Sequence, residues 1–264
     1  LSRDWDNLRE QLDDMVAMLE QETDYREEAR FQQLARRTLA PLADIVVPRV
    51  HAGLCTPRVL VTDLLRGQHL PDFLASAPTQ EQRDARGRQI MAVGFRLYYG
   101  ASLVYTDPHP GNFLFLPDGR LGVLDFGSCR ELQGEDLEFV RLMERAYHGD
   151  AAAWETALRL GTRQPPDAPL GDEHRELIRR FADWLWEPIR HEGPFDLGRE
   201  DYFPRGVALW TEFVRRRLTR SLPVNTWVNR NFIGLRALGY RLGARVDMRE
   251  LYTAASSAAG RARP

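Results

Sequence analysis

Apolar residues recur at intervals of three and four near the start of the chain and through its second half. Near the start the repeat contains Trp5, Leu8, Leu12, Met15, Val16 and Leu19. This spacing places apolar side chains on one helical face, so we expect one amphipathic helix over 4–39, with a break near 20–24. The second half is expected to contain helices at 135–148, 150–160, 173–192, 205–220, 224–243 and 247–259.

The middle of the chain contains short runs of β-branched and other apolar residues. The runs 45–50 and 58–62 are bounded by proline and glycine, so they predict a pair of strands. The runs 113–116 and 121–124 flank the turn sequence Pro-Asp-Gly-Arg, which predicts a hairpin.

Two helices are expected between these strands. A short one covers 71–75. Thr79 followed by Gln82 matches a capping box, which predicts the start of a longer helix reaching about residue 104. Its buried stripe is expected to contain Ile90, Val93, Gly94, Leu97 and Ala101. The predicted fold class is therefore α+β and mainly helical.

Composition adds a few limits. The 264 residues are enough for one large domain or two small ones with an ample core. The net charge of −2 gives no indication of a nucleic-acid partner. No run of about 18 apolar residues is present, so we expect no membrane-spanning helix. Cys55 and Cys129 match no disulfide or metal-binding pattern, and without a signal-peptide pattern the expected compartment is the reducing cytoplasm.

The strongest candidate for chemistry is the sequence Asp-Pro-His-Pro-Gly-Asn at 107–112, whose prolines and glycine disfavour helix. Asp107 and Asn112 are followed by the hairpin and then by Asp125 of an Asp-Phe-Gly triplet. In protein kinases a loop Asp orients the attacking hydroxyl, an Asn five residues later binds Mg²⁺, and the Asp of Asp-Phe-Gly binds Mg²⁺ across the phosphates. Each motif alone occurs in ordinary turns, but their order and spacing favour a phosphate- and magnesium-binding centre. His109, between two prolines, is expected to brace the loop as a hydrogen-bond donor, with a catalytic base as the alternative.

These residues resemble the UbiB (AarF) family of atypical kinase-like proteins, in which Asp-Pro-His-Pro-Gly-Asn replaces the usual kinase catalytic loop. Two further stretches agree: the sequence at 22–29 resembles the family's acidic motif, and 59–67 resembles its hinge. The motifs cover about residues 1–150. The resemblance implies a protein-kinase-like fold, with 1–66 as part of an N-lobe and 67–264 as a helical C-lobe.

The resemblance also implies ligands, which are ATP and Mg²⁺. Asp107 would be the catalytic residue, and Asn112 and Asp125 would bind the metal. The residues implied near the nucleotide are Glu22, Asp24, Glu28, Asp63 and Leu65. Judged from spacing alone, Asp24 and Glu28 would share one helix face, where a solvated acidic surface is the ordinary interpretation.

The function implied by the resemblance is that of a bacterial kinase or ATPase supporting isoprenoid-quinone (ubiquinone) biosynthesis. The implied partners are a nucleotide, an isoprenoid lipid and quinone-biosynthesis proteins, with peripheral contact at the inner membrane. The segment after Gly127 is too short to be a usual activation segment, and a helix is expected to begin near Gly134. This favours a small-molecule or lipid-linked substrate, or ATP hydrolysis, over phosphorylation of proteins.

The chain departs from the family pattern at several points. All 36 basic residues are arginine, so the strand lysine that kinases place on the phosphates is absent, as is a glycine- or alanine-rich nucleotide loop. Phe31 and Tyr105 stand where the family usually has Asn and His. We therefore expect either a fragment that begins near the helix bearing Glu28 or a degenerate homologue. Two alternatives stay open: a non-catalytic pseudokinase module that binds nucleotide or lipid, and a small-molecule phosphotransferase related to aminoglycoside or choline kinases.

Two of the later helices are rich in aromatic residues, and their apolar side chains are expected to be core. These side chains are Phe181, Trp184, Trp186 and Ile189 in one helix and Val207, Trp210, Phe213 and Val214 in the other. The alternative is an apolar groove for an isoprenoid lipid or a membrane surface, with 215–217 and Arg220 near anionic headgroups.

Overall fold

A computed structural model describes residue 9 and residues 24–162, 170–216 and 221–261. The first described helix, α2, covers Tyr25–Leu39. Asp24 has an extended backbone and accepts a hydrogen bond from the Arg26 amide, so it is the N-cap of α2. The prediction that Asp24 and Glu28 share a helix face is wrong for this reason, because Asp24 precedes the helix. The predicted helical part at 10–23 lies outside the described residues.

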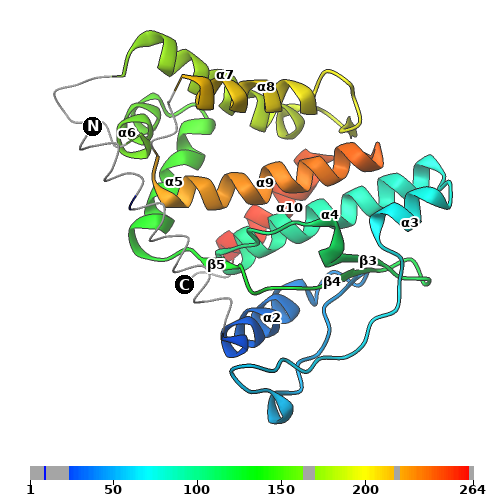
Figure 1. The fold of residues 1–264 in the computed structure, drawn as a ribbon. Coiled ribbons are helices and arrows are strands. Elements are labelled where there is room, and N and C mark those ends of the chain that lie inside the picture. The colour runs from blue at the N-terminus through cyan, green and yellow to red at the C-terminus, as the bar shows by residue number, and fades with distance from the viewer. Residues whose placement is uncertain (1–8, 10–23, 163–169, 217–220, 262–264) are drawn as a thin grey trace.

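The long helix α4, Gln80–Ala101, runs through the centre of the molecule (Figure 1). The capping box predicted at its start is present, since Thr79 accepts from the Gln82 amide while the Gln82 side chain accepts from the Thr79 amide. Four residues of the predicted stripe are buried, and Ala101 is half-buried. The helix ends at Ser102, whose left-handed backbone (φ +51°) turns the chain into β2, Leu103–Val104.

Three small sheets lie beside this helix. In the largest, β1 (Ile45–Val46) pairs in parallel with β4 (Leu121–Val123), which pairs antiparallel with β3 (Phe113–Phe115). The β3–β4 pair is the predicted hairpin. Strand β2 pairs with β5 (Arg130–Glu131), and β6 (Phe195–Asp196) pairs with β7 (Arg245–Val246).

The predicted pairing of 45–50 with 58–62 is found, but it is short. Val50 and Thr62 form an antiparallel bridge, and the Asp63 amide donates to the Arg49 carbonyl at 3.0 Å. The turn of 3₁₀ helix η1, Ala52–Leu54, lies between the two segments. A narrow ladder therefore replaces the longer strand pair.

The other regular elements of the described chain are helices (Figure 1), and the predicted short helix and six later helices are all present. Their bounds are Leu70–Ala75 (α3), Gly134–Tyr147 (α5), Ala151–Gly161 (α6), Asp172–Arg190 (α7), Phe203–Arg215 (α8), Pro223–Leu242 (α9) and Met248–Arg261 (α10). Among the described residues no helix combines the length and the apolar character needed to cross a bilayer.

One large hydrophobic core joins most of these elements. Phe31, Ala35 and Leu39 of α2 belong to the same buried cluster as Ile90 and Leu97 of α4. The N-terminal elements are thus packed directly on the helical part rather than on a core of their own.

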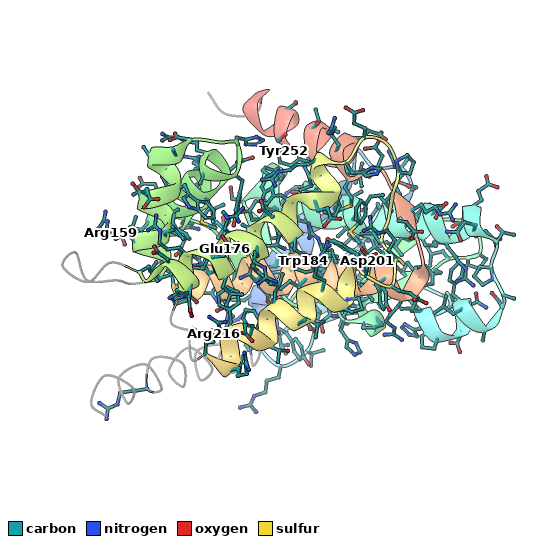
Figure 2. The ribbon with its side chains drawn as sticks, turned by 90° about the horizontal axis from the view of Figure 1, so that it is seen from above. Arg159, Glu176, Trp184, Asp201, Arg216 and Tyr252 are labelled. Atoms are coloured by element: carbon teal, nitrogen blue, oxygen red, sulfur yellow. The ribbon has the colours of Figure 1, made fainter. Side chains whose placement is uncertain are left out.

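Helices α7 and α8 lie side by side over the long helices (Figure 2). Trp184 fills the space above Gly206, where an added Cβ would lie 2.1 Å from the indole. The prediction that these residues are core holds for Phe181, Trp184 and Phe213. It is wrong for three residues of α8, which are 44–54% exposed: Val207, Trp210 and Val214.

Candidate functional site

The Asp-Pro-His-Pro-Gly-Asn loop includes a turn of 3₁₀ helix, η2, Pro110–Asn112. Within it the side chain of Asn112 turns back and donates through Nδ2 to the Asp107 carbonyl at 3.0 Å and to Asp107 Oδ2 at 3.3 Å. His109 Nδ1 accepts from the Gly111 amide at 3.0 Å, so the histidine braces the loop, but as an acceptor rather than as the predicted donor. The loop is therefore held by its own side chains, with Asp107 fixed by Asn112.

Tyr105 connects the loop to the segment that contains Asp125. Its side chain is buried, and its hydroxyl donates to the Leu124 carbonyl at 2.8 Å. Burial raises the pKa of the phenol well above its ordinary value, so it stays a neutral donor. Because Leu124 precedes Asp125, this hydrogen bond connects the two predicted catalytic segments.

Asp125 stands just after β4, in the left-handed region with φ +57°. This conformation is uncommon for a residue other than glycine, although Asp tolerates it better than most. The Asp125 Oδ1 atom accepts from the Gly127 amide at 3.1 Å, which supports the turn. The amide of Leu124 donates to the Asn112 carbonyl at 2.8 Å and holds this segment against the loop.

Glu28 reaches the same turn from α2. Its Oε1 atom accepts from the Phe126 amide at 3.4 Å. The carboxylates of Glu28 and Asp125 both approach the Cα of Gly127, where an added Cβ would lie 3.3 Å and 3.6 Å from their oxygens. A helix near the start of the described chain and the Asp-Phe-Gly turn are thus brought together across 98 residues.

An open cleft of about 570 Å³ contains three of the predicted acidic residues, which are Glu28, Asp107 and Asp125. The other lining residues are Tyr25, Gln32, Pro48, Leu60, Thr62, Leu124, Gly127 and Ser128. Asn112 stands behind Asp107 and contacts it. The lining therefore combines three carboxylates with apolar residues that include Pro48 and Leu60.

The other predicted site residues are not among those that line this cleft. Asp24 is hydrogen-bonded to the Arg26 guanidinium, which lowers the pKa of its carboxyl. Asp63 accepts from His51 Nε2 at 2.7 Å, and this contact lowers the Asp63 pKa. Leu65 packs over Gly122 of β4. Glu22 lies outside the described residues.

Gln32 is a lining residue that the sequence interpretation did not single out. Its Nε2 atom donates to the Pro48 carbonyl at 2.8 Å, so it ties α2 to the segment after β1. A signal was available, because Gln32 follows Glu28 by four positions and therefore lies on the same helix face. Tyr25 and Ser128 were also missed, and no pattern in the sequence marks them.

The oxygen atoms in this cleft suit a hard divalent cation that retains other ligands. No group of three or more His, Cys, Asp or Glu side chains in the described residues is close enough to form a complete metal site. Mg²⁺ does not require one, because it commonly takes one or two carboxylates and completes its shell with waters and phosphate oxygens. Asp125, which lines the cleft, fits that pattern, whereas the predicted ligand Asn112 is not a lining residue and its amide donates to Asp107.

Comparisons with known proteins identify the family that this chain resembles. The profile of the ABC1 atypical kinase-like domain family matches residues 1–157. The chain is 28% identical over 237 residues to the mitochondrial atypical kinase COQ8B of Rattus norvegicus, covering 88% of this chain and 43% of that protein. It is 26% identical over 242 residues to the mitochondrial atypical kinase coq-8 of Caenorhabditis elegans, covering 89% of this chain and 31% of that protein.

A solved structure shows the same fold. The Rv3197–erythromycin complex from Mycobacterium tuberculosis aligns with a TM-score of 0.64 and 24% identity, over 91% of this chain and 60% of that one. The chain spans less than half of the length of the two curated relatives described above.

Proposed function

This chain belongs to the ABC1 (UbiB/AarF) family of atypical kinase-like proteins, and on that premise we propose that its carboxylate cleft binds Mg²⁺-ATP and transfers or hydrolyses the terminal phosphate. The observation that carries the proposal is the convergence of Glu28, Asp107 and Asp125 on one cleft, with Asn112 hydrogen-bonded to Asp107. A structural ion-pair network would not need the strained turn that places Asp125 there.

Each residue has a distinct part in this proposal. Asp125 and Asn112 would hold Mg²⁺, which neutralises charge that develops on the phosphates. Asp107 would orient the attacking hydroxyl or water and accept its proton, while Asn112 fixes its carboxylate. Glu28 would hold α2 against the Asp-Phe-Gly turn through the Phe126 amide. The segment from Pro48 through Thr62 to Leu65 would receive the adenine.

The substrate is proposed to be small or lipid-linked, in support of isoprenoid-quinone biosynthesis. Named atypical kinases of the COQ8 group are among the relatives, which supports this assignment. The connection from Gly127 to α5 contains only 128–133, and two of these residues form β5. So short a segment leaves little surface on which to dock a protein substrate. We also propose that the protein acts in the cytoplasm, peripherally at a membrane.

A second candidate is a binding module without catalysis. One observation favours it: Phe31 of α2 is a buried apolar residue at a position where the family usually has Asn. Such a module would bind nucleotide through Asp125 and show no turnover.

The two candidates are separated by replacing Asp107 in the full-length protein. Asp107→Asn should leave Mg²⁺-nucleotide affinity within about threefold of wild type and should lower turnover roughly 100-fold or more, because general-base groups typically contribute factors of this size. Asp118→Asn is the matched control, since Asp118 is exposed in the hairpin turn and pairs only with Arg120 among described residues. Equal turnover in the Asp107 and Asp118 variants would exclude the proposed catalytic role.

A further inference from the structure

A second cavity, which is partly open to solvent, lies among α5, α6, α7, α8 and α9 and shares no lining residue with the carboxylate cleft. Its volume is about 130 Å³, close to that of protein cavities that hold a benzene-sized molecule. An adjoining cavity of about 80 Å³ shares the lining residues Phe139, Met143 and Tyr147 with it. The two cavities together offer more room than a single aromatic ring needs. The size therefore suits a molecule of one or two fused rings.

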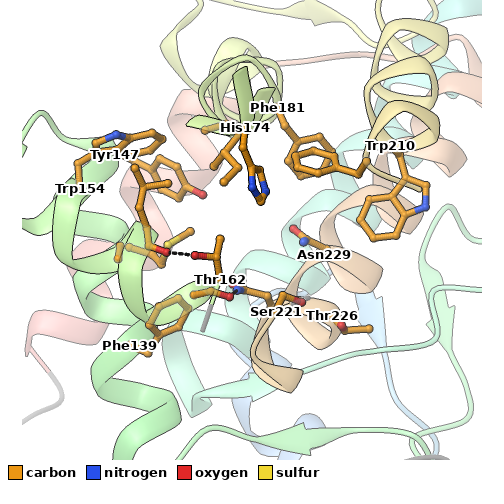
Figure 3. A pocket seen from close by; sticks show the side chains of 18 residues that line it. Phe139, Tyr147, Trp154, Thr162, His174, Phe181, Trp210, Ser221, Thr226 and Asn229 are labelled. Carbon is orange, nitrogen blue, oxygen red and sulfur yellow. Dashed lines mark hydrogen bonds between the residues drawn. The ribbon is translucent and has the colours of Figure 1, made fainter. Parts of the chain in front are cut away.

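Six of the 18 residues that line the cavity are Phe, Tyr or Trp (Figure 3). The Phe181 ring centroid lies 6.3 Å from that of Trp210 and 5.6 Å from that of Phe213. On the other side Tyr147 and Trp154 are 6.4 Å apart. These rings pack against one another in pairs, so aromatic contacts hold part of the wall. A flat apolar ligand would bury its surface there without reorganising the wall.

One polar atom in this wall has no partner among the described residues. It is the buried Nε2 atom of His174, whose ring points into the cavity (Figure 3). Buried polar atoms in proteins are nearly always hydrogen-bonded, so this nitrogen is a vacant bonding position. Burial also lowers the pKa of His174, which keeps the ring neutral and lets one nitrogen accept. The nearby Thr162 hydroxyl already donates to the Leu158 carbonyl.

Among the described residues no Asp, Glu, Lys or Arg side chain lines this cavity, whereas Glu144 and Arg236 line the adjoining one. A charged ligand in the larger cavity would therefore lose its hydration without compensation from the described lining. We propose that the cavity binds an uncharged, flat aromatic molecule of one or two rings that carries a single N–H or O–H group, with that group donating to His174 Nε2. Trp210, which is 44% exposed, stands at the cavity on the solvent side and gives such a molecule an apolar surface beside its site.

Indole and 1-methylindole are suitable probes, because they share a ring system and only indole donates a hydrogen bond. Calorimetric titration of the full-length protein should show saturable binding of both, with indole roughly two- to tenfold tighter, the range of a net neutral hydrogen bond. In His174→Phe this preference should disappear while both compounds still bind. A preference caused only by the added methyl group would persist in that variant.

His69→Phe is the matched control, since His69 is exposed and its side chain makes no capping hydrogen bond. It should retain the indole preference. Ala157→Phe, which fills the cavity, should remove binding of both compounds, with circular dichroism confirming its fold. Failure of both compounds to bind saturably, equal affinity for the two, or an unchanged preference in His174→Phe would each overturn the proposal. Asp125→Asn should bind indole as wild type does, so this test does not depend on the nucleotide proposal.

Discussion

At the scale of single residues, the site depends on hydrogen bonds that join its two halves. Tyr105 replaces the histidine usual in kinase loops, yet it anchors the Asp-Phe-Gly segment by donating to the Leu124 carbonyl. The tyrosine hydroxyl is thus the hydrogen-bond donor that holds the loop at this position. The substitution is thus compatible with a working loop.

Removing this donor should destabilise the protein. Tyr105→Phe retains the ring but leaves the Leu124 carbonyl without its partner in a buried place, which should lower the free energy of unfolding by about 1–3 kcal/mol. Tyr240→Phe is a control, because its ring stacks on Phe203 and survives the change. Urea titrations of both variants measure the difference. Equal midpoints for the two would refute the anchoring role.

Sequence patterns indicated the residue types of the site but not their conformations. Spacing marked Asp107, Asn112 and Asp125, because their order along the chain carries the information. The positive φ of Asp125 and the capping role of Asp24 depend on how the backbone turns locally, and several turns fit the same letters. Asp63 illustrates the same limit, since its contact with His51 joins positions twelve residues apart.

At the scale of elements, α4 positions the loop that bears Asp107. Its start is set by the Thr79 capping box and its end by Ser102, which leads directly into β2 and the loop. Helix lengths were predictable within a few residues because caps and apolar periodicity are local. The exposure of the apolar residues of α8 could not be predicted, since periodicity identifies an apolar face without showing what covers it.

The cap of α4 can be tested directly. Thr79→Ala should lower the free energy of unfolding by about 0.5–2 kcal/mol, the usual cost of losing an N-cap side chain. Thr211→Ala in the exposed part of α8 is the comparison, since it lacks a capping role and Ala is the better helix former. Thermal unfolding of both variants measures the loss of stability in each. A loss in Thr211→Ala as large as that in Thr79→Ala would contradict the assignment.

Helix α9 supports the loop from the other side. A Cβ at Gly234 would lie 2.3 Å from Pro108 Cγ, so Gly234→Ala must displace the residue next to Asp107. Overpacking of this kind costs about 1–3 kcal/mol, and a displacement of about 1 Å at a reacting group can lower turnover on the order of 100-fold. Gly53→Ala is the control, because nothing lies within 4 Å of its added Cβ. Turnover is measured for both variants. Equal turnover of Gly234→Ala and Gly53→Ala would contradict the expectation.

At the scale of the whole molecule, one core spans the segment before the hinge and the helical part after it. Cys129 lies in this core with its thiol fully buried, and burial raises its pKa well above the ordinary value. Cys55 is only half-buried. The contact between α2 and α4 could not be predicted, since it joins segments about 60 residues apart with no local pattern that pairs them.

The two thiols should therefore report different events. Under native conditions a small alkylating reagent should label Cys55 at least about tenfold faster than Cys129, because only the thiolate reacts and burial suppresses it. Labelling of Cys129 should follow global unfolding in urea, as mass spectrometry of the two peptides would show. Equal native rates would indicate that the core opens locally near the cleft.

The central claim is that Asp125 binds a magnesium-bound nucleotide in the carboxylate cleft. Calorimetric titration of the full-length protein with ATP, with and without Mg²⁺, tests it most directly when wild type is compared with Asp125→Asn and with the exposed Asp201→Asn. We expect Mg²⁺-dependent binding in wild type and in Asp201→Asn, and its loss in Asp125→Asn. Unchanged Mg²⁺-dependent affinity in Asp125→Asn would contradict the account.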